Sequence, residues 1–231
     1  MRDVSQNYRS VRRQIDEAAS SCGRDPQEVL LLAVSKTMPE QDILDLYNIG
    51  VRDFGENRIQ ELERKAAALP DDIVWHFIGP LQSNKIRKAV KLASVIHSVE
   101  DIQTVERLDR IAGEEQRNVK FLIEVNVSGE ASKGGVTPEE FMCVAEAAAK
   151  CRNACFSGLM TMAPLSAPQE QLDDVFNGLA ALKCKAEKEL GVTLPILSMG
   201  MSGDYLNAIA AGSTVVRVGT AIFGRSSAVQ S

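Results

Sequence analysis

The 231-residue sequence has an ordinary globular composition, with 45% hydrophobic and 25% charged residues. This length allows one α/β barrel or one large doubly wound domain. A net charge of −5 offers no general basic surface, so neither a nucleic acid nor an anionic membrane is an expected partner.

The cysteines and the amino terminus indicate a reducing compartment. Five cysteines are scattered without a CxxC pair, and the two histidines lie far from Cys151 and Cys155, so no metal site is expected. Met1 to Asn7 lack the apolar core of a signal peptide, and no apolar run reaches the length of a membrane span. We therefore expect a cytoplasmic protein.

Short apolar strands alternate with amphipathic helices along the chain. Residues 3–22 carry apolar residues at helical spacing and predict an opening helix. Eight strands are then expected, the longest at 119–127, with the others at about 29–35, 51–57, 74–79, 95–98, 156–162, 194–199 and 215–218. Helices are expected at 39–50, 58–69, 83–92, 100–116, from Thr137 onward, 168–190 and 204–211.

Two of these helices have recognisable start signals. Pro39 is expected in the first turn of its helix, where proline is tolerated. Thr137 is a good N-cap, followed by Pro138 at the first helical position and by Glu140 at the position of a capping box.

Eight strands, seven of them followed by a clear helix, indicate a single (β/α)8 TIM-type barrel over residues 1–231 with an added N-terminal helix. A doubly wound open sheet is the alternative. The polar residues 225–231 are expected to form a disordered tail.

Active sites of such barrels lie where the carboxyl ends of the strands meet. Polar residues at the predicted strand ends should therefore converge on one mouth. These are Lys36, Asn57, Gln82, Ser83, Asn84, Ser98, Asn126, Ser128, Thr161, Ser202 and Arg217.

Lys36 ends the first strand, directly after the apolar run Leu30 to Val34. Partial burial would disfavour its ammonium form and make the free amine available as a nucleophile toward a carbonyl. A lysine in this place can also be an ordinary solvated residue, with its stem packed and its head in water.

Two glycine-containing stretches near the end of the chain suit a phosphate. Ser198 to Asp204 brings glycines, the hydroxyl of Ser202 and a helix start with free N–H groups. Arg217 to Thr220 leaves the eighth strand with two further N–H donors. Each stretch alone can be a plain turn, but the loops after strands seven and eight are recurrent phosphate sites of this barrel. A reactive amine, a phosphate cradle and an arginine facing a pyridine nitrogen suit pyridoxal 5′-phosphate (PLP).

From about residue 8 to 224, the sequence resembles the pyridoxal phosphate homeostasis protein family. The segments that carry the resemblance are Ala33–Thr37, Phe54–Asn57, His76–Lys85, Gly158–Ala163, Ser198–Asp204 and Arg217–Gly224. The resemblance implies a barrel similar to the cofactor-binding barrel of bacterial alanine racemase. Lys36 would form a Schiff base with PLP, and Arg217 would meet the pyridine nitrogen. The phosphate would be bound by Ser202, Gly203, Gly219 and Thr220, and the ring would be lined by Asn57 and Met199.

The chain departs from the family pattern at Met38, where relatives often carry a basic residue, and in the segment Arg225–Ser227. Lys133 matches a family lysine in the loop after strand five, where it can touch the cofactor or remain solvated.

An arginine at the pyridine nitrogen disfavours protonation of the ring and weakens it as an electron sink. Racemisation also needs a second base opposite Lys36, and neither His76 nor His97 stands out as that base. The favoured hypothesis is a protein of PLP homeostasis that buffers the cofactor or delivers it to apo-enzymes, as a monomer or weak dimer. The alternatives are a PLP-dependent amino-acid racemase or lyase, and a Schiff-base aldolase that uses Lys36 directly.

Overall fold

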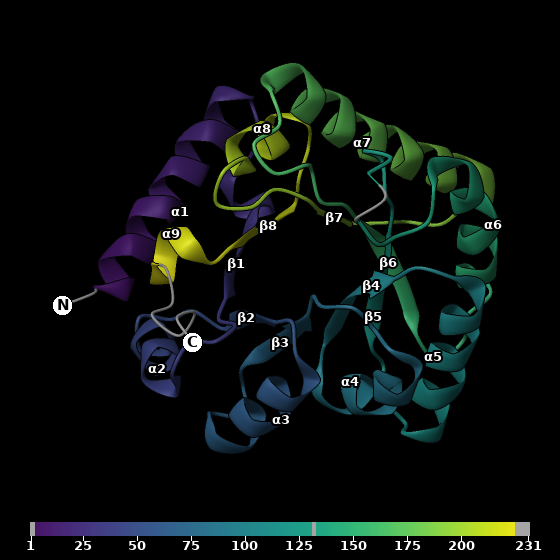
Figure 1. The fold of residues 1–231 in the computed structure, drawn as a ribbon, viewed down its shortest axis with the longest axis horizontal. Coiled ribbons are helices and arrows are strands. Elements are labelled where there is room, and N and C mark those ends of the chain that lie inside the picture. The colour runs from purple at the N-terminus through teal and green to yellow at the C-terminus, as the bar shows by residue number, and fades with distance from the viewer. Residues whose placement is uncertain (1–2, 131–132, 225–231) are drawn as a thin grey trace.

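Eight parallel strands form a closed barrel in the computed structural model, which describes residues 3–130 and 133–224 (Figure 1). Each strand pairs with the next one in the sequence, and β8 pairs with β1, matching Leu30 with Val215 and Ala33 with Val218. The barrel prediction is confirmed. The alternative of an open sheet is wrong, because an open sheet would leave β1 and β8 unpaired.

Strands and helices alternate as the hydrophobic pattern predicts. The strands are β1 (Leu30–Val34), β2 (Asp53–Glu56), β3 (Val74–Phe77), β4 (Val95–Val99), β5 (Lys120–Glu124), β6 (Cys155–Met160), β7 (Ile196–Ser198) and β8 (Val215–Val218). The helices are α1 (Val4–Ser21), α2 (Glu40–Asn48), α3 (Ile59–Ala68), α4 (Ile86–Leu92), α5 (Ile102–Glu114), α6 (Pro138–Ala148), α7 (Gln169–Leu190), α8 (Tyr205–Ala210) and α9 (Thr220–Phe223).

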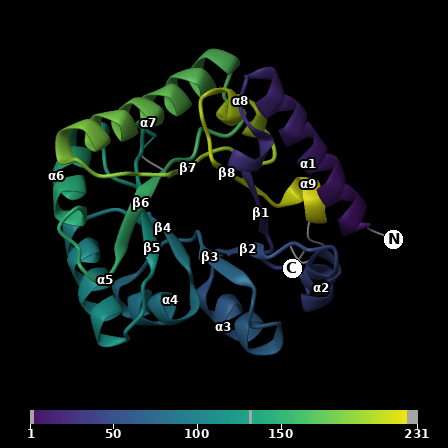
Figure 2. The same cartoon turned by 180° about the vertical axis from the view of Figure 1, so that it is seen from behind.

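Helix α1 is the added N-terminal helix, and it covers the barrel where its first and last strands meet. Val11, Ile15 and Ala19 form its buried face, and Asn7 Nδ2 donates to the carbonyl of Ile222 at 2.9 Å. Figures 1 and 2 show α1 beside α8 and α9 from both sides. The helix therefore packs against the segments that follow β7 and β8.

Several local details differ from the sequence-based expectations. The capping box of Thr137 and Glu140 is confirmed, but Pro39 is the N-cap of α2 and does not lie in its first turn. The longest strand is β6, because its six residues exceed the five of β5. Residues 225–231, the expected tail, lie outside the described residues. Among the helices that the structure describes, none is long and apolar enough to span a membrane.

Candidate functional site

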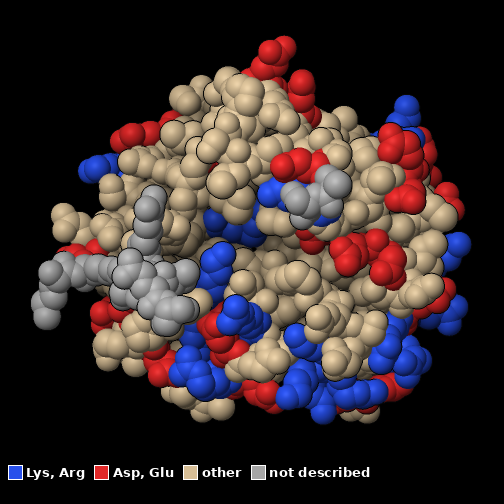
Figure 3. All heavy atoms as spheres, in the orientation of Figure 1, with Lys and Arg blue, Asp and Glu red and all other residues tan. Residues whose placement is uncertain are grey.

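The barrel is hollowed near the centre of one end, and Lys and Arg atoms lie in this hollow (Figure 3). Parallel strands in a closed barrel all end at the same face, which is called the mouth below.

Lys36 lies just beyond the end of β1 and is exposed. The expected partial burial is wrong, because burial stops at Ser35 and the chain then turns outward through Lys36 and Thr37. Thr37 has a φ of 63°, a left-handed conformation that β-branched residues rarely adopt. Since such backbone strain persists only where the surroundings enforce it, the turn that presents Lys36 must be fixed by its neighbours.

A buried ionic cluster under this turn fixes it from both sides. The Lys65 ammonium on α3 donates to the carbonyl of Ser35 at 2.8 Å and to Glu56 Oε1 at 2.6 Å, and its side chain has no exposed surface. Glu61 Oε2 lies 3.6 Å from the same ammonium and accepts from the N–H of Thr37 at 2.8 Å. The backbone groups before and after Lys36 are therefore both tied to α3. Lys65, Glu56, Glu61 and Ser35 are called the Lys65 cluster below.

Glu56 is the buried anion of this cluster. Burial raises the pKa of its carboxyl, whereas the Lys65 ammonium and the Ser35 hydroxyl act in the opposite direction. Its second oxygen, Oε2, is buried and has no hydrogen-bond partner among residues 3–130 and 133–224. The cluster depends on Lys65, because a buried carboxylate without a counterion is costly.

Arg217 on β8 lies deep in the barrel and is 4% exposed. Its Nη1 donates to the carbonyl and to the hydroxyl of Ser198, both at 2.7 Å, and Nη2 donates to the carbonyl of Thr161 at 2.9 Å. Burial lowers the pKa of Arg217 to about 10, while the negative charges of Glu124 and Asp204 act against this shift. Nε makes no hydrogen bond within the part of the chain that the structure describes, so this N–H is available to a ligand.

Four further side chains connect Arg217 to the other end of the barrel. The hydroxyl of Ser198 lies 2.9 Å from His97 Nδ1, and His97 Nε2 lies 2.9 Å from His76 Nδ1. His76 Nε2 in turn lies 3.1 Å from Asp53 Oδ1. Arg217, Ser198, His97, His76 and Asp53 are called the interior network below. Sequence reasoning considered both histidines as single residues and missed this connection.

The two stretches predicted to hold a phosphate lie together. Ser202, in the loop after β7, accepts at its hydroxyl from the N–H of Ala221 in α9 at 3.3 Å. Gly203 and Thr220 are exposed and Gly219 is half-buried, and the first N–H groups of a helix have no partner within that helix. These loops therefore offer a hydroxyl and backbone donors at one place, as an anion requires.

Gly200 sets the course of the loop after β7. Its φ is +94°, and a Cβ there would lie 2.6 Å from the Cβ of Ala208. Its carbonyl accepts from the backbone N–H of Arg217 at 2.9 Å, and Asp204 Oδ1 accepts from the N–H of Met201 at 2.5 Å. Any other residue at position 200 would push α8 away and disturb the spacing of these two loops.

Glu124, at the end of β5, is a residue that sequence reasoning missed. It is 7% exposed, and burial together with the charge of Glu100 raises the pKa of its carboxyl to about 7, against the opposing charge of Arg217. A group with this pKa can hold or release a proton near neutral pH. The one signal in the sequence that could have revealed it is an acidic residue inside the apolar strand predicted at 119–127.

The remaining predicted residues differ in what they offer to a ligand. Asn57 Oδ1 is buried and unpartnered among the described residues. Met199 is fully buried in the hydrophobic core, which favours a packing role over direct contact with a ring. Lys133 lies in the loop after β5, with its Nζ 3.9 Å from Glu130 Oε2.

These groups fit the parts of PLP. The exposed amine of Lys36 suits the aldehyde, the free Nε of Arg217 suits the pyridine nitrogen, and the N–H groups beside Ser202 suit the phosphate. The buried and unpartnered Asn57 Oδ1 offers a further acceptor. The donor set is therefore compatible with this cofactor.

Comparison with known proteins agrees with the fold. Residues 6–227 match the family "Alanine racemase, N-terminal domain". The pyridoxal phosphate homeostasis protein of Vibrio alginolyticus is 43% identical over 230 residues, covering 97% of this chain and 98% of the relative. The chain therefore belongs to the alanine racemase N-terminal domain family and, within it, to the pyridoxal phosphate homeostasis proteins.

Solved structures show the same architecture. An unknown protein from Bifidobacterium adolescentis superposes with a TM-score of 0.90 at 35% identity, covering 95% of this chain and 94% of the other. PipY of Synechococcus elongatus PCC7942, solved with PLP bound, superposes with a TM-score of 0.81 at 38% identity. The match covers 91% of this chain and 100% of the PipY chain.

Proposed function

We propose that this protein binds PLP as a Schiff base on Lys36 and acts in intracellular PLP homeostasis, by buffering the cofactor or delivering it. The observation that carries the proposal is the placement of Lys36, whose exposed amine is presented by a turn that the Lys65 cluster fixes on both sides. PLP, when bound, supplies an aldehyde that condenses with an amine and releases water. Ser202, Gly203, Gly219 and Thr220 would hold the phosphate, with Arg217 at the pyridine nitrogen and Asn57 beside the ring.

The exposure of Lys36 supports a role in holding and releasing the cofactor. A buried lysine would have to be desolvated, whereas an exposed one remains accessible to water and to a competing amine. We propose a cytoplasmic location, transient contact with apo-enzymes that need PLP, and a monomer or weak dimer. Robust turnover of amino acids is not part of this proposal.

The test is the absorption spectrum of purified protein after addition of PLP, before and after borohydride reduction. We expect a yellow band that reduction converts into a permanent adduct on Lys36, located by peptide mass. Lys36→Ala should abolish the adduct and change the free energy of unfolding by no more than about 0.5 kcal/mol, because the side chain is exposed. Lys133→Ala is the matched control and should keep the adduct. A protein that takes up no PLP would overturn the proposal and favour the aldolase alternative.

Glu124 supports a second candidate, a PLP-dependent amino-acid racemase or lyase of narrow scope. Its carboxyl can exchange a proton near neutral pH and lies within the electrostatic reach of Arg217. Incubation of PLP-loaded protein with single amino-acid enantiomers would separate the candidates. Turnover that disappears in Glu124→Gln while PLP still binds would favour the enzyme, and absence of turnover in both proteins would favour the homeostasis role.

A further inference from the structure

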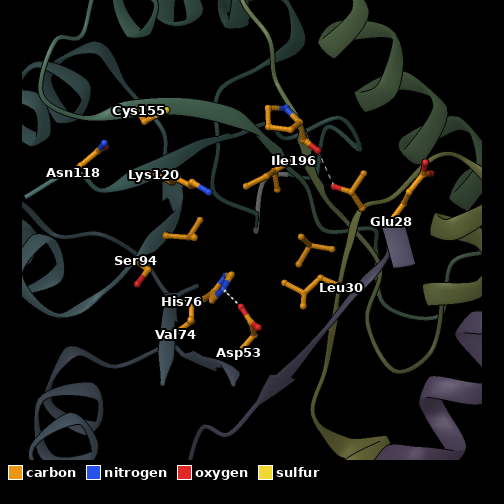
Figure 4. Close-up of a pocket in the computed structure, with 14 residues that line it drawn as sticks. Glu28, Leu30, Asp53, Val74, His76, Ser94, Asn118, Lys120, Cys155 and Ile196 are labelled. Atoms are coloured by element: carbon orange, nitrogen blue, oxygen red, sulfur yellow. Dashed lines mark hydrogen bonds and ion pairs between the residues drawn. The ribbon is translucent and has the colours of Figure 1, made fainter. Parts of the chain in front are cut away.

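The amino-terminal end of the barrel contains a cavity of about 490 Å³, opposite the mouth. Its lining includes the first residue of every strand, namely Leu30, Asp53, Val74, Val95, Lys120, Cys155, Ile196 and Val215. His76 and Asp53 point toward each other in it (Figure 4). The side chain of Asp53 is 28% exposed, so the interior network ends at solvent.

The network passes through the barrel and does not follow its wall. Asp53, His76 and His97 lie on the neighbouring strands β2, β3 and β4. The next step, from His97 to Ser198, joins β4 to β7, although β5 and β6 separate these strands in the sheet. It therefore crosses the interior, where His97 and Ser198 are both fully buried.

For two neutral imidazoles, a single arrangement of protons satisfies every link. A carboxylate only accepts, so His76 must carry its proton on Nε2 beside Asp53. Its bare Nδ1 must then accept from His97 Nε2, which leaves His97 Nδ1 to accept from the hydroxyl of Ser198. Ser198 accepts from Arg217, which can only donate. Every hydrogen bond of the network is thus donated in the same direction, from Arg217 toward Asp53.

We propose that Ser198, His97, His76 and Asp53 are positioning residues for Arg217, and that they couple the mouth to the cavity at the opposite end of the barrel. Each imidazole has partners on both nitrogens, so no ring can turn without breaking a buried hydrogen bond. Both oxygens of Ser198 hold Nη1 of Arg217, which leaves Nε free toward a ligand. Burial, and after it the neighbouring His76 and the charge of Arg217, keep the pKa of His97 well below its usual value, which agrees with a neutral ring.

Nuclear magnetic resonance of cofactor-free protein labelled with ¹⁵N-histidine tests the arrangement directly. The chain has two histidines, so each signal can be assigned from one variant. At pH 7 we expect both rings to carry a single proton, on Nε2, with Nδ1 bare. A proton on Nδ1 of either ring, or on both nitrogens of one ring, would overturn the proposal.

The coupling to the mouth is tested by adding PLP, and this part rests on the function proposed above. Bound PLP should shift the signals of both histidines. Ser198→Ala removes the side-chain link to Arg217, so the His76 signals should no longer shift when PLP is added. The dissociation constant of PLP should rise about 2- to 12-fold in this variant, as expected for the loss of one hydrogen bond. An unchanged response in this variant, or none in wild-type protein that binds PLP, would contradict the coupling.

Two variants at the cavity complete the test. Asp53→Asn should shift the signals of His97, two links away, and it provides a second measurement if Ser198→Ala fails to fold. Glu28→Gln removes a carboxylate that lines the same cavity outside the network, and it should leave the signals of both rings unchanged. Equal shifts of the histidine signals in the two variants would mean that any change of charge at the cavity acts on the rings through space, without the hydrogen bonds. That result would overturn the proposal. If wild-type protein binds no PLP, the proposed function fails, whereas the proton positions still decide whether the network exists.

Discussion

The Lys65 cluster and the interior network hold two parts of the same mouth by different means. The cluster joins β2, α3 and the segment after β1 through the contacts of the buried Lys65 ammonium and of Glu61. It fixes the backbone on both sides of an exposed lysine. The network keeps its charges at its two ends and fills the space between them with a hydroxyl and two imidazoles. The exposed Lys36 is thus positioned through the backbone on either side of it, whereas the buried Arg217 is positioned through hydrogen bonds of its own side chain.

The two arrangements should also differ in how much stability each member contributes. A buried ion pair that loses one partner leaves an uncompensated charge, which is strongly destabilising. A neutral hydrogen-bonded chain loses about 0.5–1.5 kcal/mol for each link. Substitutions in the cluster should therefore cost more than substitutions in the network.

The largest effect is expected for Lys65→Met. The variant leaves Glu56 buried without its counterion and releases the carbonyl of Ser35, so the free energy of unfolding should fall by about 3–5 kcal/mol. Urea denaturation measures this difference. Lys88→Met is the matched control, because Lys88 pairs with Glu63 at the surface and should contribute no more than about 1 kcal/mol. Similar losses in both variants would show that the buried cluster has no special role.

Glu124 is a third case. Among residues 3–130 and 133–224 its buried carboxyl has neither the counterion contact of the cluster nor the hydrogen bonds of the network. Its pKa of about 7 in the folded state lies above the value near 4.5 in the unfolded state. Between pH 4.5 and pH 7 the folded state therefore binds more protons than the unfolded state. Stability should therefore fall as the pH rises from about 4.5 to 7, by up to about 3 kcal/mol. Glu124→Gln should remove this loss.

Urea denaturation of wild-type protein and Glu124→Gln at pH 5 and pH 8 checks that prediction. The variant should gain stability relative to wild type mainly at pH 8, where the wild-type carboxyl is ionised in both states. A difference that stays constant between the two pH values would show that the carboxyl does not titrate in this range.

The sequence was sufficient to predict the barrel, because buried strands with helices between them follow a clear pattern from Leu30 to Val218. It also predicted that the loops after β7 and β8 belong together, and the contact of Ser202 with Ala221 confirms their proximity. The roles of these residues toward PLP stay predictions.

Features that depend on three-dimensional packing could not be predicted in the same way. The burial of Lys36 was predicted wrongly, because the apolar run does not reveal that the chain turns outward after Ser35. Lys65 follows Glu61 by four residues, a spacing that in a helix usually indicates an exposed ion pair. The contact of His97 with Ser198 joins residues 101 positions apart, and no local pattern encodes such a contact.

The smallest effect is expected for Asp53→Asn, and the equivalent change in the cluster gives the sharpest comparison. Both Asp53→Asn and Glu56→Gln replace a carboxylate by an amide of the same shape. Asp53 is 28% exposed and its amide can still accept from His76, so the free energy of unfolding should fall by less than about 1 kcal/mol. Glu56→Gln leaves the buried Lys65 ammonium without its closest anion and should cost several times more.

Urea denaturation of the two variants side by side at pH 7 measures this ratio, because the chemical change is the same and only the surroundings differ. Equal losses would mean that Asp53 holds the interior network through its charge, as Glu56 does in the Lys65 cluster. A larger loss for Glu56→Gln would mean that the network depends on the direction of its hydrogen bonds, which an amide oxygen at position 53 can preserve.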